Sequence, residues 1–327
     1  MFYKELGNTA MKISALSFGT WAIGGAWGKT NDHDALEGLA RAIDLGVNFF
    51  DTADVYGDGH SEELLAKATK GKEGEIYIAS KFCRAGDIHD PTNYSEEVVT
   101  NYCEQSLKRL QREYIDLYQI HCPPMDILRA GHVFDTLEKL KTQGKIRYYG
   151  VSVETVEEGL YVLEHTNASS LQVIFNLFRQ KPLKKLFPLA LEKEVGILSR
   201  VPLASGLLTG KFTEQTSFAS DDHRYFNKDG AAFNVGETFA GIEFARGVEL
   251  SRKLEWIAEG RDNMTRAALK WIVEQEAVTS VIPGFRNKHQ VEDNVGALAV
   301  KAYQDDELEK LRRFYELEVK PYIRGAY

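Results

Sequence analysis

The sequence predicts an α/β protein, a (β/α)8 TIM barrel formed by residues 1–327 as a single domain. Three observations indicate this fold class. Short apolar runs alternate with longer amphipathic segments, which is typical of parallel strands joined by helical crossovers. The length suits eight such repeats around one large core. No change in composition along the chain indicates a linker between domains.

Eight segments are candidate strands because each is short and rich in residues that favour extended backbone. They are Leu16–Phe18, Val47–Phe50, Ile76–Ala79, Asp116–Ile120, Ile146–Val151, Leu171–Ile174, Gly196–Arg200 and Thr279–Ile282. Helical patterns such as Ser95–Leu110 and Ala130–Lys141 lie between most of them.

Two segments add to this basic barrel. Phe2–Ser14 predicts a hairpin that turns at Gly7-Asn8 and closes the bottom of the barrel. Ser205–Ala240 is a long segment rich in Gly, Ser, Asp and Phe, and loops of this length are usually functional lids or disordered.

The composition excludes several classes of protein. A net charge of -8 disfavours nucleic acid as a partner, because phosphate binding needs a basic surface. No apolar run is long enough for a membrane span, and no signal peptide is visible. Three cysteines are too few for a disulfide framework, so we expect a cytoplasmic protein. The sequence does not specify an oligomeric state.

Polar residues follow the second, third and fourth candidate strands. They are Asp51 and Tyr56, then Lys81, then His121. Because the carboxyl ends of barrel strands form the active site, we expect these four side chains to share one mouth.

Such a set suits acid-catalysed reduction of a carbonyl group. A free phenol titrates at about pH 10, and a neighbouring ammonium lowers that pKa by favouring phenolate. A carboxylate holds the ammonium in place, and an imidazole can orient the carbonyl oxygen. No set of His, Cys and carboxylate residues has the spacing of a zinc site, so no metal is expected.

Six motifs resemble the aldo-keto reductase family, in order and at that family's spacing. They are GTWAIGG, GVNFFDTADVYGDGHSEELL, IYIASKF, DLYQIHCP, PLASGLLTGKF and IPGFRNKHQVEDN, which together span roughly residues 3–300. Within that family, the sequence resembles bacterial general-stress and inositol-linked reductases and potassium-channel β subunits.

The resemblance implies a catalytic tetrad and a small carbonyl compound, possibly sugar-like, as substrate. Tyr56 would donate the proton, Lys81 would lower its pKa, Asp51 would pair with Lys81, and His121 would position the carbonyl. The substrate mouth would comprise Trp21, Trp27, Tyr56, Phe82 and His121.

The resemblance also implies a nicotinamide cofactor, NADPH, which residues after several strands would bind. Gly19, Thr20, Trp21 and Asp51 would border the nicotinamide, and Ser152 and Gln172 would bind its carboxamide. Pro202, Leu203, Ser205 and Lys211 would line the pyrophosphate, with Ser205–Ala240 closing over it and Arg224 reaching the phosphates. Gly284, Arg286, Gln290, Asp293 and Asn294 would hold the adenosine end.

Two positions depart from the family pattern, and a third residue, Arg286, favours NADPH as the cofactor. Val153 stands where the family usually has Asn, and Arg200 stands where an aromatic residue usually stacks on the nicotinamide. A guanidinium plane can also stack, so Arg200 is a candidate substitute. Arg286 could bind the 2′-phosphate, although Gln290 replaces an arginine found in part of the family.

Other interpretations remain open at this stage. Asp51 could cap a helix, His121 could be a core residue, Arg200 could form an ordinary ion pair, and Arg286 could be a surface residue. A regulatory subunit that binds NADP(H) and turns over slowly is an alternative function. A barrel isomerase usually needs paired carboxylates and a metal, which the sequence does not indicate.

Overall fold

A computed structural model, which describes residues 1–25, 27 and 31–327, confirms the predicted barrel. Eight parallel strands form one sheet in sequence order, and each overlaps a predicted strand. They are β3 (Phe18–Gly19), β4 (Phe49–Asp51), β5 (Tyr77–Phe82), β6 (Ile115–His121), β7 (Ile146–Ser152), β8 (Ser170–Ile174), β9 (Gly196–Arg200) and β10 (Val278–Ile282). Parallel bridges from Leu16 to Val281 and from Gly19 to Gly284 join the two ends of the sheet and close it.

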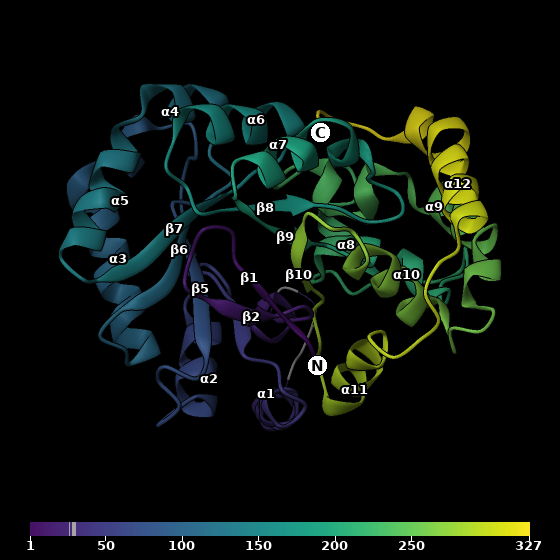
Figure 1. The fold of residues 1–327 in the computed structure, drawn as a ribbon, viewed down its shortest axis with the longest axis horizontal. Helices are drawn as coiled ribbons and strands as arrows, with labels where there is room; N and C mark the ends of the chain where they lie inside the picture. Colours follow the sequence, from purple (N-terminus) through teal and green to yellow (C-terminus); the bar gives the residue numbers. More distant parts are fainter. Residues whose placement is uncertain (26, 28–30) are drawn as a thin grey trace.

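Helices surround the strands, as the ribbon shows (Figure 1). They are α1 (Asp32–Asp44), α2 (His60–Ala68), α3 (Glu96–Leu110), α4 (Met125–Ala130), α5 (His132–Thr142), α6 (Val156–His165), α7 (Leu186–Glu192), α8 (His223–Phe226), α9 (Phe244–Arg252), α10 (Met264–Val273), α11 (Lys288–Gly296) and α12 (Asp305–Phe314). In the described ranges, no helix combines the length and apolar character that crossing a membrane requires.

Local sequence signals explain where these helices begin and end. Thr155 and Glu158 form a reciprocal capping box at the start of α6. In α3, Val99, Cys103, Ser106 and Leu110 recur on one buried face at helical spacing. The predicted helix Ala130–Lys141 begins late, because Gly131 adopts a left-handed conformation that separates α4 from α5.

An N-terminal hairpin is present, as predicted. Strands β1 (Tyr3–Glu5) and β2 (Lys12–Ser14) pair antiparallel around a turn in which Gly7 has a φ of 55°. A Cβ on Gly7 would lie 2.5 Å from the carbonyl oxygen of Glu194, so the turn requires glycine. Leu6, Met11 and Ile13 pack into an inner cluster with barrel residues such as Leu117, so the hairpin fills one end of the barrel.

Strand alternation separates side chains that point into the barrel from those that face the helices. In β5, Ala79 belongs to the inner cluster, whereas Ile78 and Phe82 belong to the outer hydrophobic core. Lys81 is two residues from Ala79 and so points inward at the end of the strand. The same alternation points Asp51, at the end of β4, and His121, at the end of β6, into the barrel, where polar groups can surround a cavity.

The long segment Ser205–Ala240 has internal hydrogen bonds that give it a defined path. It contains all of η4 (Ala204–Thr209) except its first residue, then α8, η5 (Val235–Glu237) and the start of η6 (Phe239–Gly241). The Ser205 hydroxyl donates to the Glu237 carbonyl and accepts from the Phe239 amide, each at 3.1 Å. An isolated antiparallel bridge joins Asp222 to Trp27 in the loop after β3.

Candidate active site

A cavity of about 1060 Å³ lies at the carboxyl ends of the barrel strands. Its wall includes Asp51 at the end of β4, Tyr56 in the following turn, and His121 at the end of β6. These side chains converge because parallel barrel strands end on the same rim. The convergence inferred from the sequence is therefore present in the fold.

Lys81 connects the members of this group from a position with no solvent exposure. Its Nζ lies 2.6 Å from Asp51 Oδ2 and 3.3 Å from the Tyr56 hydroxyl, and it donates to the Thr52 carbonyl at 2.8 Å. All three donor positions of the ammonium are therefore engaged. Lys81 lies behind Asp51 and Tyr56 and is not part of the cavity wall.

Two amide side chains fix the other oxygen of Asp51. Gln172 on β8 donates to Asp51 Oδ1 at 2.7 Å, and Gln119 on β6 donates to it at 3.3 Å. Asp51 is 4% exposed, so these two donors and Lys81 must stabilise its negative charge in place of water. Gln119 was not among the residues predicted from the sequence, although its place two residues before His121 on an inward-facing register could have indicated it.

The turn that carries Tyr56 depends on close backbone contact with the first loop. Gly57 has a φ of 64°, and a Cβ there would lie 2.0 Å from the Gly24 carbonyl oxygen. The Trp21 ring stacks on Tyr56 with centroids 6.1 Å apart. Glycine at position 57 therefore lets the two loops approach and fixes the phenol in the cavity wall.

Burial is the largest single influence on the pKa values of Tyr56 and Lys81. It raises the pKa of Tyr56 above its usual value and outweighs the Lys81 ammonium, which acts to lower it. From the sequence, we expect Lys81 to lower the pKa of Tyr56. Lys81 does contribute a lowering, but the net shift of this pKa is upward. Burial acts to lower the pKa of Lys81, but Asp51 and Tyr56 raise it above its usual value, so the ammonium stays charged.

The surroundings of His121 favour its neutral form. Burial, followed by the positive charges of Arg84 and Lys81, holds its pKa well below the usual range. Its ring meets Tyr56 edge to face at 5.9 Å between centroids, and its Nδ1 has no hydrogen-bond partner among the described residues. A neutral imidazole at this position can donate one hydrogen bond to an oxygen in the cavity.

Most residues expected at the cofactor line the same cavity. They are Gly19, Trp21, Asp51, Gln172, Arg200, Pro202, Leu203, Ser205, Lys211, Arg224, Gly284, Arg286, Gln290, Asp293 and Asn294. Trp27, expected at the substrate mouth, lines it as well. Asn287 caps α11, and the backbone amide of Arg286 donates to the Gln290 side chain at 2.8 Å.

Besides Lys81, three expected site residues lie outside the cavity wall, namely Thr20, Ser152 and Phe82. The Thr20 side chain is buried and donates to the Asp51 carbonyl at 3.0 Å, and the Ser152 hydroxyl donates to Gln172 Oε1 at 3.5 Å. Phe82 corrects the prediction for the substrate mouth, because it is fully buried and stacks on Tyr118 at 4.5 Å. Strand alternation directs Phe82 toward the helices, since its neighbour Lys81 points inward.

Arg200 forms ion pairs, the alternative to stacking that the sequence left open, within a buried ionic group whose other members the sequence did not predict. It lies 3.4 Å from Glu154 and 3.5 Å from Glu237, and Arg84 donates to Glu237 at 2.8 Å. All four side chains line the cavity. Arg84 and Glu154 follow β5 and β7 by two residues, so the rule that identified Lys81 could have found them, whereas Glu237 belongs to the long segment.

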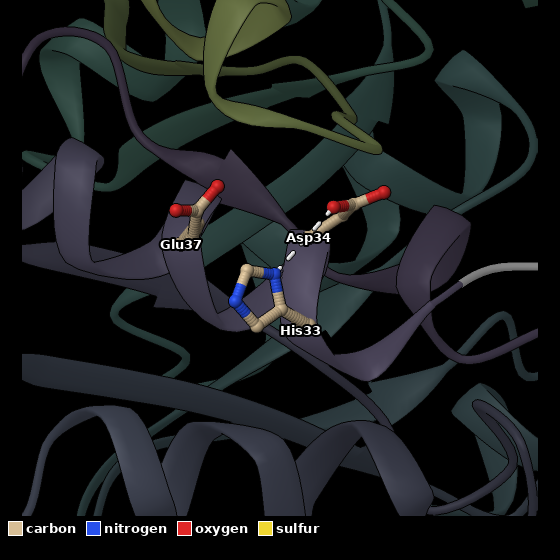
Figure 2. Close-up of side chains that lie close together, drawn as sticks. All are labelled: His33, Asp34 and Glu37. Atoms are coloured by element: carbon tan, nitrogen blue, oxygen red, sulfur yellow. Dashed lines mark ion pairs between the residues drawn. The ribbon is translucent and has the colours of Figure 1, made fainter.

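Two groups of described side chains each bring three potential metal ligands together. Figure 2 shows His33, Asp34 and Glu37 projecting from the start of α1, with the His33 ring 3.7 Å from Asp34. All three are exposed. In the second group, Cys122, Glu154 and Glu237, the guanidiniums of Arg84 and Arg200 already neutralise the carboxylates and disfavour a cation. The expectation that no metal is bound stays a prediction.

Comparisons with known proteins agree with this arrangement. The sequence profile described as the aldo/keto reductase family matches residues 15–316. The aldo-keto reductase YhdN of Bacillus subtilis is 31% identical over 298 residues, which cover 89% of this chain and 87% of that protein. A probable voltage-gated potassium channel subunit beta of Arabidopsis thaliana is 27% identical and covers 92% of each chain.

Solved structures extend the similarity to the fold. The glycerol dehydrogenase AKR11B4 from Gluconobacter oxydans matches with a TM-score of 0.78 at 29% identity, over 99% of this chain and 98% of that chain. The holo form of aldo-keto reductase AKR11C1 from Bacillus halodurans matches with a TM-score of 0.76 at 24% identity, over 100% and 98%. Similarity in sequence and in fold therefore extends over nearly the whole chain.

Proposed function

The chain belongs to the aldo/keto reductase family and is an NAD(P)H-dependent oxidoreductase, and from this premise we propose that it reduces an aldehyde or a ketone with hydride from NADPH while Tyr56 supplies the proton. One observation carries the proposal. The Tyr56 hydroxyl lies in the cavity wall, 3.3 Å from Lys81 Nζ, which itself lies 2.6 Å from Asp51. In this order, the phenol can act as a general acid, the ammonium can stabilise the phenolate that it leaves, and the carboxylate keeps the ammonium charged.

In the proposed reaction the carbonyl oxygen lies between the Tyr56 hydroxyl and the His121 ring. When bound, the reduced nicotinamide supplies the hydride that adds to the carbonyl carbon. Tyr56 Oη gives its proton to the oxygen as that oxygen gains negative charge. The raised pKa keeps the phenol protonated at neutral pH, and an alkoxide is basic enough to take this proton. Lys81 then stabilises the phenolate through the contact that it already makes.

The residues around the cavity fit a dinucleotide. The volume of about 1060 Å³ exceeds the need of a small carbonyl compound. Three basic side chains, Lys211, Arg224 and Arg286, line the cavity and suit phosphate groups. Gln172 and Trp21 would hold the nicotinamide, and Pro202, Leu203 and Ser205 would follow the pyrophosphate. Gly284, Gln290, Asp293 and Asn294 would surround the adenosine, beside the N-terminus of α11.

We expect NADPH to be preferred over NADH because of Arg286. The two cofactors differ by one phosphate group, so discrimination needs a positive charge near that group. Arg286 lies two residues before α11 and lines the cavity. No carboxylate occupies residues 284–288 to repel the phosphate.

Turnover of NADPH with a simple aldehyde tests the proposal and separates it from a regulatory subunit. The relatives include potassium-channel β subunits, so a binding protein with slow turnover is the second candidate. An enzyme should consume NADPH and form the alcohol in equal amounts over many turnovers. Tight NADPH binding with at most one equivalent of alcohol per chain would support the regulatory alternative and contradict the proposal.

A further inference from the structure

The turn that carries Tyr56 also contains a buried carboxyl group that the proposed reaction does not use. Asp54 lies between Asp51 and Tyr56 in the chain, is 7% exposed and is not part of the cavity wall. Its backbone amide donates to the Lys81 carbonyl at 3.2 Å. Among the described residues, neither oxygen of its side chain has a hydrogen-bond partner, and both are shielded from solvent. Because a carboxylate without hydrogen bonds or water is costly, these surroundings favour the protonated acid.

A second buried carboxyl group lies behind the same turn, on the side of the helices. Glu62 of α2 is fully buried and accepts hydrogen bonds from the Ser80 hydroxyl at 2.5 Å and from Arg109 Nε at 2.6 Å. Arg109, on α3, passes close under the turn, because a Cβ on Gly59 would lie 2.3 Å from its Cδ. Neither Glu62 nor Arg109 is part of the cavity wall, so this polar cluster is separate from the substrate side of the turn.

Neighbouring charges act on Asp54 in opposite directions, and burial decides the balance. Burial, followed by the negative charge of Glu62, raises the pKa of Asp54 to about 7, whereas Arg109 and Lys81 lower it by less. The hydrogen bonds explain this balance, because Arg109 binds Glu62 and Lys81 binds Asp51. Both nearby cations are thus committed to other carboxylates, and Asp54 forms no ion pair within the described ranges.

The other titratable side chains that interact with Asp54 stay neutral over the same pH range. They are Tyr118 on β6, Tyr102 on α3 and Cys83 directly after β5. Burial is the main cause that raises the pKa of each above its ordinary value, which is already about 8.5 or higher. Asp54 is therefore the member of this group that changes its charge near neutral pH.

We propose that Asp54 is a positioning residue that sets the upper pH limit of the reaction, because its neutral form keeps the Tyr56 turn in place and its anion weakens Tyr56 as a proton donor. This inference rests on the proposed function. Two physical effects act in the same direction. An anion two residues from Tyr56 repels the phenolate that proton transfer leaves. An anion without water or hydrogen bonds, close to the Glu62 carboxylate, also favours movement of the turn toward solvent.

The kinetic test follows NADPH oxidation in a single turnover, in which the protein saturated with NADPH is mixed with a saturating aldehyde. For the unmodified protein, we expect the rate to fall about three- to tenfold between pH 6 and pH 8.5, with a midpoint near the pKa of about 7. Asp54→Asn cannot ionise, so its rate should stay within twofold of its own pH 6 value. Asp54→Ser, a smaller neutral side chain, takes its place if Asp54→Asn does not fold. An unmodified protein whose rate is constant over this range would overturn the inference without any variant.

Two carboxyl groups outside the cluster define the controls. Asp58→Asn is the matched variant, because Asp58 is an exposed carboxylate of the same turn, and this variant should keep the full pH-dependent fall. Glu154 lines the cavity, and burial raises its pKa to about 7 as well, so its titration would produce a fall at the same pH. A fall that persists unchanged in Asp54→Asn would therefore assign the effect elsewhere and overturn the inference.

Thermal unfolding gives a second measurement that does not depend on catalysis. The pKa of Asp54 rises from 3.8 to about 7 on folding, so between these values the folded chain holds a proton that the unfolded chain releases. The stability that neutral Asp54 contributes is fully present below this range and is lost as the pH rises through it. From pH 5 to pH 8, the Tm of Asp54→Asn should therefore gain about 2–4 °C on that of the unmodified protein. The Tm of Asp58→Asn should run parallel to the unmodified protein.

The outcomes separate this inference from the proposed function. If the Tm of Asp54→Asn runs parallel to the unmodified protein, Asp54 is not a neutral acid in the folded chain and the inference is wrong, while the reductase function stands. If the Tm values diverge but the kinetic fall persists in Asp54→Asn, Asp54 titrates without acting on Tyr56, and the inference is again wrong. If the unmodified protein oxidises no NADPH with any aldehyde, the proposed function has failed and the inference fails with it.

Discussion

Replacing Asp51 with Asn should destabilise the barrel as well as the proposed proton donor. The substitution keeps the shape of the side chain and an oxygen for Gln172, which donates to Asp51 at 2.7 Å. It removes the negative charge that lies 2.6 Å from Lys81 Nζ. Lys81 is fully buried, so its ammonium would keep only the Thr52 carbonyl and the Tyr56 hydroxyl as partners.

The expected loss follows from the burial of the pair. Removing one partner of a buried ion pair costs about 3–5 kcal/mol, and the two remaining acceptors of Lys81 favour the lower end. An unfolding entropy of about 2.1 cal/mol/K per residue, over 327 residues, converts about 3 kcal/mol into a fall in Tm of roughly 4 °C. Asp34→Asn on the exposed face of α1 should leave the Tm unchanged.

Thermal unfolding followed by circular dichroism, at one scan rate for all variants, measures this loss. The double variant Asp51→Asn/Lys81→Met removes both charges, so it should recover part of the stability that the single variant loses. A Tm for Asp51→Asn within 1 °C of the unmodified protein would refute the argument. Strictly additive losses in the double variant would show that the two side chains do not stabilise each other.

Three further predictions concern the cofactor, the long segment and the Tyr56 turn. Arg286→Ala should lower the NADPH-to-NADH ratio of kcat/KM about ten- to a hundredfold, and an unchanged ratio would make Arg286 a surface residue. Trypsin should cut first at the exposed Lys211 or Lys228, and saturating NADPH should slow this cleavage if Ser205–Ala240 closes over the cofactor; an identical cleavage rate with and without NADPH would argue against closure. Gly57→Ala should reduce kcat about 10- to 100-fold by displacing Tyr56, whereas Gly71→Ala, a glycine of positive φ with open space around it, should be fully active.

The sequence identified the barrel and the converging side chains because both follow from local rules. Strand ends meet on one rim, so Asp51, Lys81 and His121 could be grouped without coordinates. Phe82 was assigned to the mouth because it follows Lys81, but the two-residue period of a strand turns consecutive side chains to opposite faces. Applying that period to β5 would have placed Phe82 among the helices.

The buried ionic group of Arg84, Glu154, Arg200 and Glu237 depends on contacts that no local pattern specifies. Glu237 reaches the cavity because Ser205 ties the two ends of the long segment together, 32 residues apart in sequence. Arg200 was considered for stacking on the nicotinamide, yet its ion pairs with Glu154 and Glu237 become visible only in the folded chain. The direction in which the pKa of Tyr56 shifts could not be predicted from the sequence either. Burial decides that direction, and burial is a property of the whole fold.

The most direct test of the proposed function is the comparison of Tyr56→Phe with the unmodified protein in NADPH-dependent reduction of an aldehyde. The substitution removes one oxygen and leaves the ring to stack on Trp21. If Tyr56 is the proton donor, kcat should fall by about 100-fold or more, while the Kd for NADPH, measured by fluorescence, should change less than twofold. A kcat close to that of the unmodified protein would contradict the assignment of Tyr56 and with it the proposed mechanism.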